Sequence, residues 1–149
     1  MPASAVLFCL VVAISDGDTL TARCGESGAY EQVKVRIAGI DAPEKAQAFG
    51  QRSREALADM CHLETATITA RTTDRYGRTV ADVQCKGQDV GSALVATGLA
   101  WVFDRYSEGY EDLYPLQRDA IADRRGLWTD PAPVAPWDWR QQRRSSARQ

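Results

Sequence analysis

The sequence predicts an α+β fold, a five-stranded OB-fold-like β-barrel with about three helices. Five short segments have the alternating or continuous apolar pattern of strands, and a helical pattern falls between the third and the fourth of them. Two further helical segments follow the fifth strand. With 149 residues, 44% hydrophobic and 26% charged, the chain has the composition of one globular domain with its own core.

The first three strands are predicted to form a meander. Residues 6–14 are almost entirely apolar, and residues 19–24 follow after a turn that contains Asp-Gly, one of the strongest hairpin signals. A second turn leads to the third strand, predicted over residues 33–40, where apolar and basic residues alternate at first. The first forty residues therefore form three neighbouring antiparallel strands.

A helix and two more strands complete the predicted barrel. Small and apolar residues recur with the spacing of one helix face at Ser53, Ala56, Leu57 and Met60, which predicts about three turns. Alternation returns at residues 65–70 for the fourth strand and at residues 81–85 for the fifth. The turn between these two strands includes residues 74–78.

Two helices and a tail follow the barrel. Asp89 is expected to cap a short helix that runs to residue 97, with Gly98 at its left-handed end. Residues 113–124 form the last predicted helix. We assign residues 1–130 to the barrel domain and residues 131–149 to an extended tail, because three prolines oppose regular structure there. Its two tryptophans, Trp137 and Trp139, would pack on the domain, and its arginine-rich end would be disordered.

Charge is unevenly distributed along the chain. The net charge is −2 and the isoelectric point is near 5.4, which argues against a broadly basic nucleic-acid-binding surface. Four of the 18 basic residues fall among the last ten positions, which leaves 14 basic against 20 acidic residues in the rest. A polyanion would therefore have to be held by a local arginine cluster or by a metal ion that offsets the carboxylates.

The cysteines and the apolar start of the chain bear on the cellular compartment. The four cysteines, Cys9, Cys24, Cys61 and Cys85, include no C-x-x-C pair, which argues against a structural zinc site. A hairpin would bring Cys9 near Cys24 and permit a disulfide, and four buried thiols are the alternative. The apolar run at residues 5–14 is too short to span a bilayer, so we interpret it as a buried first strand.

Charged residues gather at the end of the third strand. Arg36 precedes Asp41 by five positions, Glu44 follows it by three, and Asp18 lies in the first turn. Carboxylate oxygens are the ligands of a hard cation such as Ca²⁺, and the planar fork of arginine fits a phosphate. Each feature alone has an ordinary alternative, a simple Asp-Gly turn or a surface ion pair. Together they favour a site for a cation and a phosphate.

Three motifs resemble the staphylococcal nuclease (thermonuclease) family in their order and spacing. They are DGDT at residues 16–19, RIAGIDAPE at residues 36–44 and DRYGR at residues 74–78. The similarity continues through residues 98–102 and 125–128, so it covers nearly the whole chain. The resemblance implies an OB-fold barrel and calcium-dependent hydrolysis of phosphodiester bonds in DNA and RNA.

The resemblance also implies a metal site and a catalytic base. Asp18 and Asp41 match the carboxylates that bind Ca²⁺, with the main-chain oxygen of Ala42 as a third ligand. Glu44 matches the residue that activates or orients the attacking water. This chemistry suits a phosphodiester, because its hydrolysis needs a base for the water and a cation that bridges the phosphate oxygens.

The remaining matched positions would contact the nucleic acid. Arg36 and Arg78 resemble the pair that holds the scissile phosphate, where a planar guanidinium can bond two oxygens at once. Arg75 and Tyr76 are similar to the groups that hold the neighbouring phosphate and the nucleoside. Tyr106 matches one of the family's stacking tyrosines only in part.

Two departures leave the substrate preference open, and two other functions remain as alternatives. The segment at residues 45–51 is shorter than the corresponding mobile loop of the best-known member, and Asp104 would repel a phosphate. The first alternative is an OB-fold module that binds nucleic acid without hydrolysis. The second is a secreted domain that binds calcium only for stability. The presence of the complete set of charged residues favours the enzyme.

The resemblance implies partners and a location as well. We expect a nucleic acid substrate, DNA or RNA, with no membrane association, and a monomeric protein. The habits of the family and the even number of cysteines predict an extracytoplasmic location, secreted or periplasmic.

Overall fold

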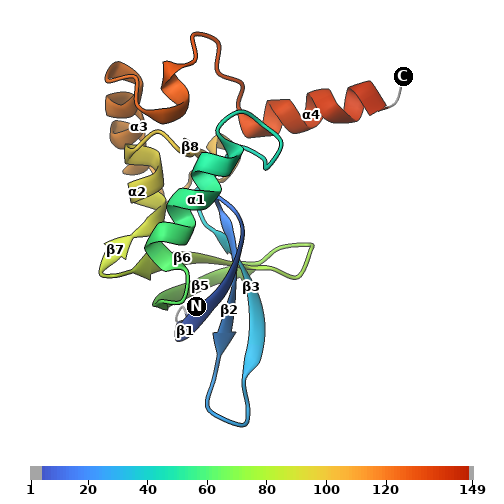
Figure 1. Ribbon diagram of the computed structural model, residues 1–149, viewed down its shortest axis with the longest axis vertical. Coiled ribbons are helices and arrows are strands. Elements are labelled where there is room, and N and C mark those ends of the chain that lie inside the picture. The colour runs from blue at the N-terminus through green and yellow to red at the C-terminus, as the bar shows by residue number, and fades with distance from the viewer. Residues whose placement is uncertain (1–4, 148–149) are drawn as a thin grey trace.

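A closed barrel of five strands forms the body of the molecule, in a computed structural model that describes residues 5–147. The strands pair in the order β3-β2-β1-β5-β6, and a parallel pairing of β3 with β6 closes the barrel (Figure 1). Their bounds are β1 (Val6–Asp16), β2 (Thr19–Cys24), β3 (Glu31–Ile37), β5 (Thr65–Thr73) and β6 (Thr79–Cys85). The predicted OB-fold-like barrel is therefore confirmed.

The third predicted strand is divided in two by a sharp turn. β3 ends at Ile37, and β4 (Ile40–Asp41) pairs instead with β8 (Trp101–Val102) in a small separate sheet. Gly39 makes this turn with a φ of 80°, and a Cβ there would lie 2.6 Å from the ring of Tyr110. The predicted strand over residues 33–40 is wrong beyond Ile37, because this turn redirects the chain. A third short strand, β7 (Gln88–Asp89), pairs antiparallel with the end of β6.

The described residues contain four α-helices rather than the predicted three or so. They are α1 (Gly50–Cys61), α2 (Val90–Ala96), α3 (Leu113–Ala122) and α4 (Pro136–Ala147), with 3₁₀ turns η1 (Asp104–Tyr106) and η2 (Gly126–Thr129). The predicted cap is confirmed, since the Asp89 side chain accepts a hydrogen bond from the Ser92 amide at 2.9 Å. In Figure 1, α1 lies across the barrel, α2 and α3 lie beside each other, and α4 extends away from the body.

The prediction of an extended tail is wrong from Pro136 onward. Pro136 begins α4, where a fixed φ and a missing amide hydrogen suit the first helical turn, and the other two prolines precede the helix, so none interrupts it. Trp137 packs on the domain as predicted, with its ring stacked on Phe103 at 5.3 Å between centroids. Trp139 has the guanidinium of Arg143 over its ring. Residues 148–149 of the predicted disordered end lie outside the described part, and the domain boundary stays a prediction.

Aliphatic side chains and two disulfides hold the barrel together. Leu20, Val35 and Ile68 fill its interior without measurable exposure, and Leu57 of α1 covers it. Disulfides join Cys9 to Cys24 across the first hairpin and Cys61 of α1 to Cys85 of β6. None of the four cysteines is free, so the alternative of buried thiols is wrong. None of the helices within residues 5–147 is long and apolar enough to cross a membrane.

Candidate active site

The first hairpin turn packs against the loop after β4. A Cβ on Gly17 would lie 2.6 Å from the Cβ of Ser53 on α1 and 2.9 Å from that of Ala42, so only glycine permits this approach. The approach lets the Ala42 amide donate a hydrogen bond of 2.8 Å to Oδ2 of Asp18, across 24 positions of the chain. The turn and the end of the third predicted strand therefore meet in one site.

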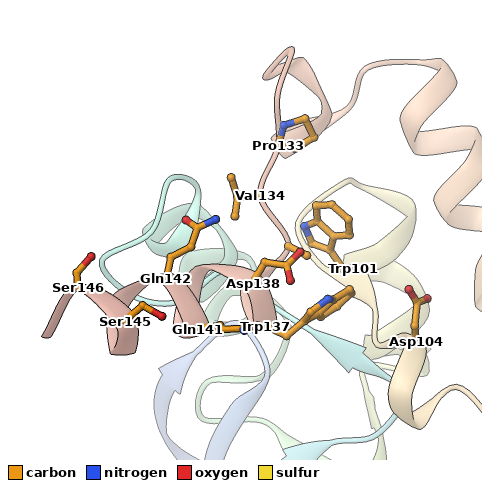
Figure 2. A pocket seen from close by; sticks show the side chains of 11 residues that line it. Trp101, Asp104, Pro133, Val134, Trp137, Asp138, Gln141, Gln142, Ser145 and Ser146 are labelled. Atoms are coloured by element: carbon orange, nitrogen blue, oxygen red, sulfur yellow. The ribbon is translucent and has the colours of Figure 1, made fainter. Parts of the chain in front are cut away.

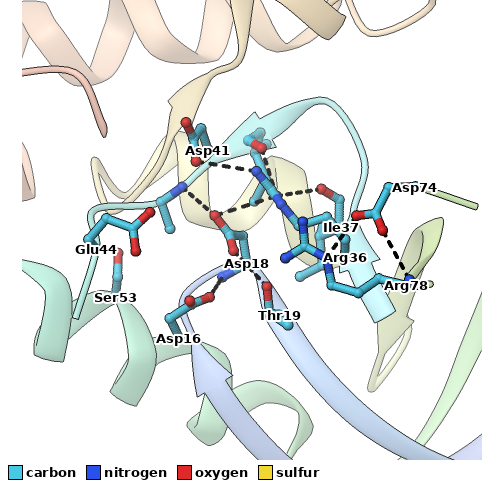
Figure 3. Close-up of polar contacts among 12 residues, drawn as sticks. Asp16, Asp18, Thr19, Arg36, Ile37, Asp41, Glu44, Ser53, Asp74 and Arg78 are labelled. Atoms are coloured by element: carbon cyan, nitrogen blue, oxygen red, sulfur yellow. Dashed lines mark hydrogen bonds and ion pairs between the residues drawn. The ribbon is translucent and has the colours of Figure 1, made fainter. Parts of the chain in front are cut away.

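Arg36 links the two carboxylates of the predicted metal site, as Figure 3 shows. Its Nη1 lies 3.4 Å from Oδ2 of Asp18, and its Nη2 lies 3.2 Å from Oδ1 of Asp41. Nη1 also donates to the main-chain oxygens of Ile37 and Ile40, which hold the guanidinium in the β3–β4 turn. Because its side chain is only 12% exposed, Arg36 acts on these carboxylates with little screening by water.

Burial shifts the titration of the neighbouring aspartates. It raises the pKa of Asp41, which is 1% exposed, to about 6, although Arg140 and Arg36 act against this rise. Burial also acts to raise the pKa of Asp18, but Arg36 and several hydrogen bonds outweigh it and hold this pKa below its usual value. Burial and repulsion from Asp18 raise the pKa of Asp16 to about 7. Burial therefore disfavours the charged forms of Asp16 and Asp41, whereas the partners of Asp18 favour its charged form.

Glu44 and Asp41 share a partner that comes from α4. Arg140 Nη1 donates to Oε1 of Glu44 at 2.7 Å and to Oδ1 of Asp41 at 3.2 Å, and its Nη2 donates to Oδ2 of Asp41 at 2.7 Å. Arg140 was not among the predicted site residues, because the arginine-rich end was expected to be disordered and no local motif links residues 96 and 99 positions apart. Asp16 belongs to the DGDT motif but was given no role in the predicted site.

The turn between β5 and β6 carries the predicted phosphate contacts. Arg78 Nε donates to Oδ2 of Asp74 at 2.7 Å, and Figure 3 draws this pair beside the Arg36 group. Arg75 Nη2 donates to the phenolic oxygen of Tyr76 at 2.7 Å, and the Tyr76 side chain is 68% exposed. The guanidinium carbons of both arginines lie over the Tyr76 ring, at 4.9 and 5.4 Å from its centroid. These three residues therefore form one cluster, in which Arg75 and Tyr76 are exposed and Arg78 is half-buried.

Tyr106 lies on a different element and reaches the site through Phe103. It is 57% exposed in η1, and its ring contacts Phe103 edge-on at 5.0 Å between centroids. The guanidinium carbon of Arg36 lies 6.0 Å from the centroid of the same Phe103 ring. Phe103 therefore connects Tyr106 to the Arg36 side of the carboxylates, whereas Tyr76 lies in the turn between β5 and β6.

The donors present fit a hard cation. Asp18, Asp41 and the Ala42 carbonyl offer only oxygen atoms, which suit Ca²⁺ and disfavour zinc. Burial raises the pKa values of Asp16 and Asp41 because it disfavours their charged forms, and a divalent cation would stabilise those forms. Within residues 5–147, no three His, Cys, Asp or Glu side chains are grouped as a metal-binding set, and Arg36 and Arg140 bond Asp41 in this structure.

A groove of about 850 Å³ runs beside the carboxylates along α4 (Figure 2). Residues of α4, of the 133–135 segment and of the region from Trp101 to Asp104 line it, and Trp101 and Trp137 lie at one end. None of the predicted site residues is among its lining residues. The groove is therefore a neighbour of the site and separate from it.

Comparison with known proteins identifies the family. Residues 34–130 match the family model described as staphylococcal nuclease homologue. The chain belongs to the staphylococcal nuclease family. The matched segment contains Arg36, Asp41, Glu44 and Arg78 but neither Asp18 nor Arg140. The predicted family is confirmed, whereas the role of each site residue stays a prediction.

Several curated proteins are similar to this chain over most of its length. An uncharacterized endonuclease of Haemophilus influenzae is 43% identical over 135 residues, which cover 90% of this chain and 73% of the relative. Protein ParB of Escherichia coli is 38% identical over 151 residues, covering 95% and 83%. The micrococcal nuclease of Shigella flexneri is 36% identical over 141 residues, covering 88% and 79%. The similarity therefore extends well beyond the segment that matches the family model.

Proposed function

We propose that this chain is a calcium-dependent nuclease that hydrolyses phosphodiester bonds of DNA, RNA or both. The observation that carries the proposal is the group formed by Asp18, Arg36 and Asp41, with Glu44 joined to it through Arg140. Membership of the staphylococcal nuclease family and the nuclease names of several relatives support it. Together they assign the chain to the hydrolases that act on nucleic acids.

The proposed chemistry assigns separate tasks to the carboxylates. Asp18, Asp41 and the Ala42 carbonyl would hold Ca²⁺, which supplies a positive charge for the phosphate oxygens. Glu44 would take a proton from the attacking water at its second oxygen, Oε2, since Oε1 accepts the bond from Arg140. Burial of Asp41 keeps water away from its carboxylate and strengthens every charge interaction there.

The arginines and tyrosines would bind the substrate. Arg36 and Arg78 would donate to the scissile phosphate and balance the charge that develops on it in the transition state. Arg75, Tyr76 and Tyr106 would contact the neighbouring phosphate and nucleoside, and the exposure of both tyrosines leaves their rings accessible. The acidic body of the protein supports weak, salt-sensitive binding through these local contacts only.

The proposal includes a location and an oligomeric state. Two buried disulfides form readily outside the reducing cytoplasm, which supports a secreted or periplasmic protein. We propose that the protein acts as a monomer on nucleic acid.

The test is digestion of heat-denatured DNA at mildly alkaline pH, with calcium and with EDTA. Wild-type protein should cleave only with calcium, and Glu44→Gln should lower turnover by about 10²- to 10⁴-fold, the usual effect of removing a general base. Glu31→Gln is the matched control, because Glu31 is exposed at the end of β3 that lies away from Arg36.

Two other results would contradict the proposal. If wild type and Glu44→Gln are equally inert but bind single strands, the chain is a binding module without hydrolysis. If calcium binds and raises stability while nucleic acid is neither bound nor cleaved, the carboxylates serve stability alone.

A further inference from the structure

Arg140 joins two carboxylates to which the proposed function gives different tasks. Its guanidinium bonds Asp41, the proposed cation ligand, through two nitrogens, and Glu44, the proposed base, through one. It is 31% exposed, as is Glu44, whereas Asp41 is almost fully buried. Arg140 lies beyond residues 34–130, the segment that matches the family model.

The first turn of α4 holds the Arg140 backbone at the site. Pro136 is buried, and the ring of Trp137 lies parallel to Phe103 at 5.3 Å and edge-on to Trp101 at 5.7 Å. Figure 2 shows Trp137 pointing toward Trp101 and the η1 region. Since Arg140 follows Trp137 by about one helical turn, its backbone stays near the carboxylates while its long side chain can change partners.

Arg140 and a cation would compete for the same oxygen atoms. A carboxylate has about four lone-pair positions, and Asp41 already accepts one hydrogen bond from Arg36 and two from Arg140. Ca²⁺ requires six to eight oxygen ligands, roughly, and would need the positions that Arg140 occupies. Binding of the cation at Asp41 should therefore displace the guanidinium of Arg140.

The displaced guanidinium would be close to the phosphate. Arg36 Nη2 and Arg140 Nη1 both lie 3.2 Å from the same atom, Oδ1 of Asp41. The two guanidinium groups therefore converge on one point, and a phosphate held by Arg36 is within reach of Arg140. A planar guanidinium bonds phosphate oxygens as well as it bonds carboxylate oxygens.

The charges of the cluster favour this exchange. Asp16, Asp18, Asp41 and Glu44 face two arginines, so the addition of one divalent cation and one phosphodiester leaves both guanidinium groups with an anionic partner. Without Arg140, Arg36 would be the one arginine bonded to these carboxylates, among the contacts described, that could meet the phosphate together with Arg78.

We propose that Arg140 is a further substrate-binding residue that pairs with Asp41 and Glu44 before the cation binds and with the phosphodiester afterwards. The inference rests on the proposed nuclease function. It adds a residue that changes its partner when the cation and the substrate bind. It assigns α4 a direct part in binding the nucleic acid strand.

The test compares Arg140→Gln with Arg143→Gln, which removes the same charge from the same helix at a residue bonded to neither carboxylate in the contacts described. Titration calorimetry with calcium chloride alone measures cation affinity, and initial rates on a labelled single-stranded DNA oligonucleotide give kcat and KM. Arg140→Gln should tighten calcium binding by about tenfold, because a competing charge-assisted contact is lost. It should also raise KM by about tenfold or more with a smaller change in kcat. Arg143→Gln should change each value by less than about twofold.

A conservative variant keeps the result interpretable. Arg140→Lys retains the charge without the planar fork, so its KM should lie between those of wild type and Arg140→Gln. Tighter calcium binding with an unchanged KM would show that Arg140 only blocks the cation, and unchanged calcium binding would show that the two do not compete. Either result overturns the inference. Both leave the nuclease proposal intact if the wild-type protein cleaves DNA with calcium, whereas inert wild-type protein would count against the nuclease itself.

Discussion

Two sites on the same barrel, one with a single carboxylate and one with several, differ in how the negative charge is balanced. Asp82 on β6 accepts a hydrogen bond of 2.6 Å from the Tyr110 hydroxyl and one of 3.0 Å from Nε of Arg71 on β5. Its side chain is 28% exposed, so water also screens its charge. This single carboxylate with two donors connects the barrel wall to the segment before α3.

The cluster at the end of the barrel is crowded by comparison. Its carboxylates share two arginines, and burial raises the pKa of Asp16 to about 7 and that of Asp41 to about 6. Stability alone would not favour such an arrangement, because each buried charge loses its hydration. The difference supports the proposal that the cluster binds a ligand able to balance its charge, whereas Asp82 contacts only groups of the fold.

The largest expected effect comes from removing the arginine that joins the cluster. Arg36→Met would leave Asp18 and Asp41 buried with fewer partners, and the free energy of unfolding should fall by about 3–5 kcal/mol. Arg71→Met, at the half-exposed Asp82, should lower it by about 0–1 kcal/mol. Urea unfolding at pH 7 in EDTA measures both. If the two variants lose equal amounts of unfolding free energy, the cluster and Asp82 do not differ in their dependence on arginine.

Calcium should stabilise the protein through the cluster alone. At a free concentration about 100 times its Kd, a ligand that binds only the folded state raises the free energy of unfolding by about 2.7 kcal/mol. Asp41→Asn should abolish this gain, and Asp82→Asn should preserve it. Thermal unfolding with calcium and with EDTA provides the measurement, and a gain that survives Asp41→Asn would place the cation elsewhere.

Removal of the Asp16 charge should change how the free energy of unfolding depends on pH. The pKa of Asp16 is raised from 3.8 to about 7 in the folded protein, so its contribution to stability is fully present below about pH 4 and is lost as the pH rises through 7. Asp16→Asn keeps a neutral acceptor, and in EDTA at pH 8 it should be more stable than wild type by about 1–2 kcal/mol. Chemical unfolding at pH 4 and pH 8 tests this. A gain of equal size at both pH values would contradict the crowding argument.

The smallest effect is expected at Asp82. Tyr110→Phe removes one hydrogen bond but leaves the Arg71 contact, so the free energy of unfolding should fall by about 0.5–1.5 kcal/mol at pH 8. Burial raises the pKa of Tyr110 to about 12, so this contribution persists until the pH exceeds about 10. A loss as large as that of Arg36→Met would mean that Asp82 is as dependent on its partners as the cluster.

Local patterns in the sequence determined most of the barrel. Alternation placed the strands, Asp-Gly placed the first hairpin, and Asp89 with Gly98 bounded α2. These features act over a few neighbouring residues, so they can be read without a structure. The motifs also brought Asp18, Arg36 and Asp41 into one predicted site, because each lies where a strand meets a turn.

Other features depended on contacts between distant parts of the chain. The turn at Gly39 ends β3 and brings this glycine so close to the Tyr110 ring that a side chain would not fit, and α4 lies where the prolines had predicted an extended tail. The Cys61–Cys85 disulfide likewise joins a helix to a strand whose relative position the sequence does not state.

The pairing of Arg140 shows most clearly what only the tertiary structure decided. The sequence alone determined a barrel with carboxylates and arginines at one end, because strand period, turn chemistry and motif spacing are local properties. It did not show that Arg140 would reach Asp41 and Glu44, 99 and 96 positions earlier. Packing of Trp137 on Phe103 brings α4 to the site, and such packing depends on shapes that exist only once the barrel has folded.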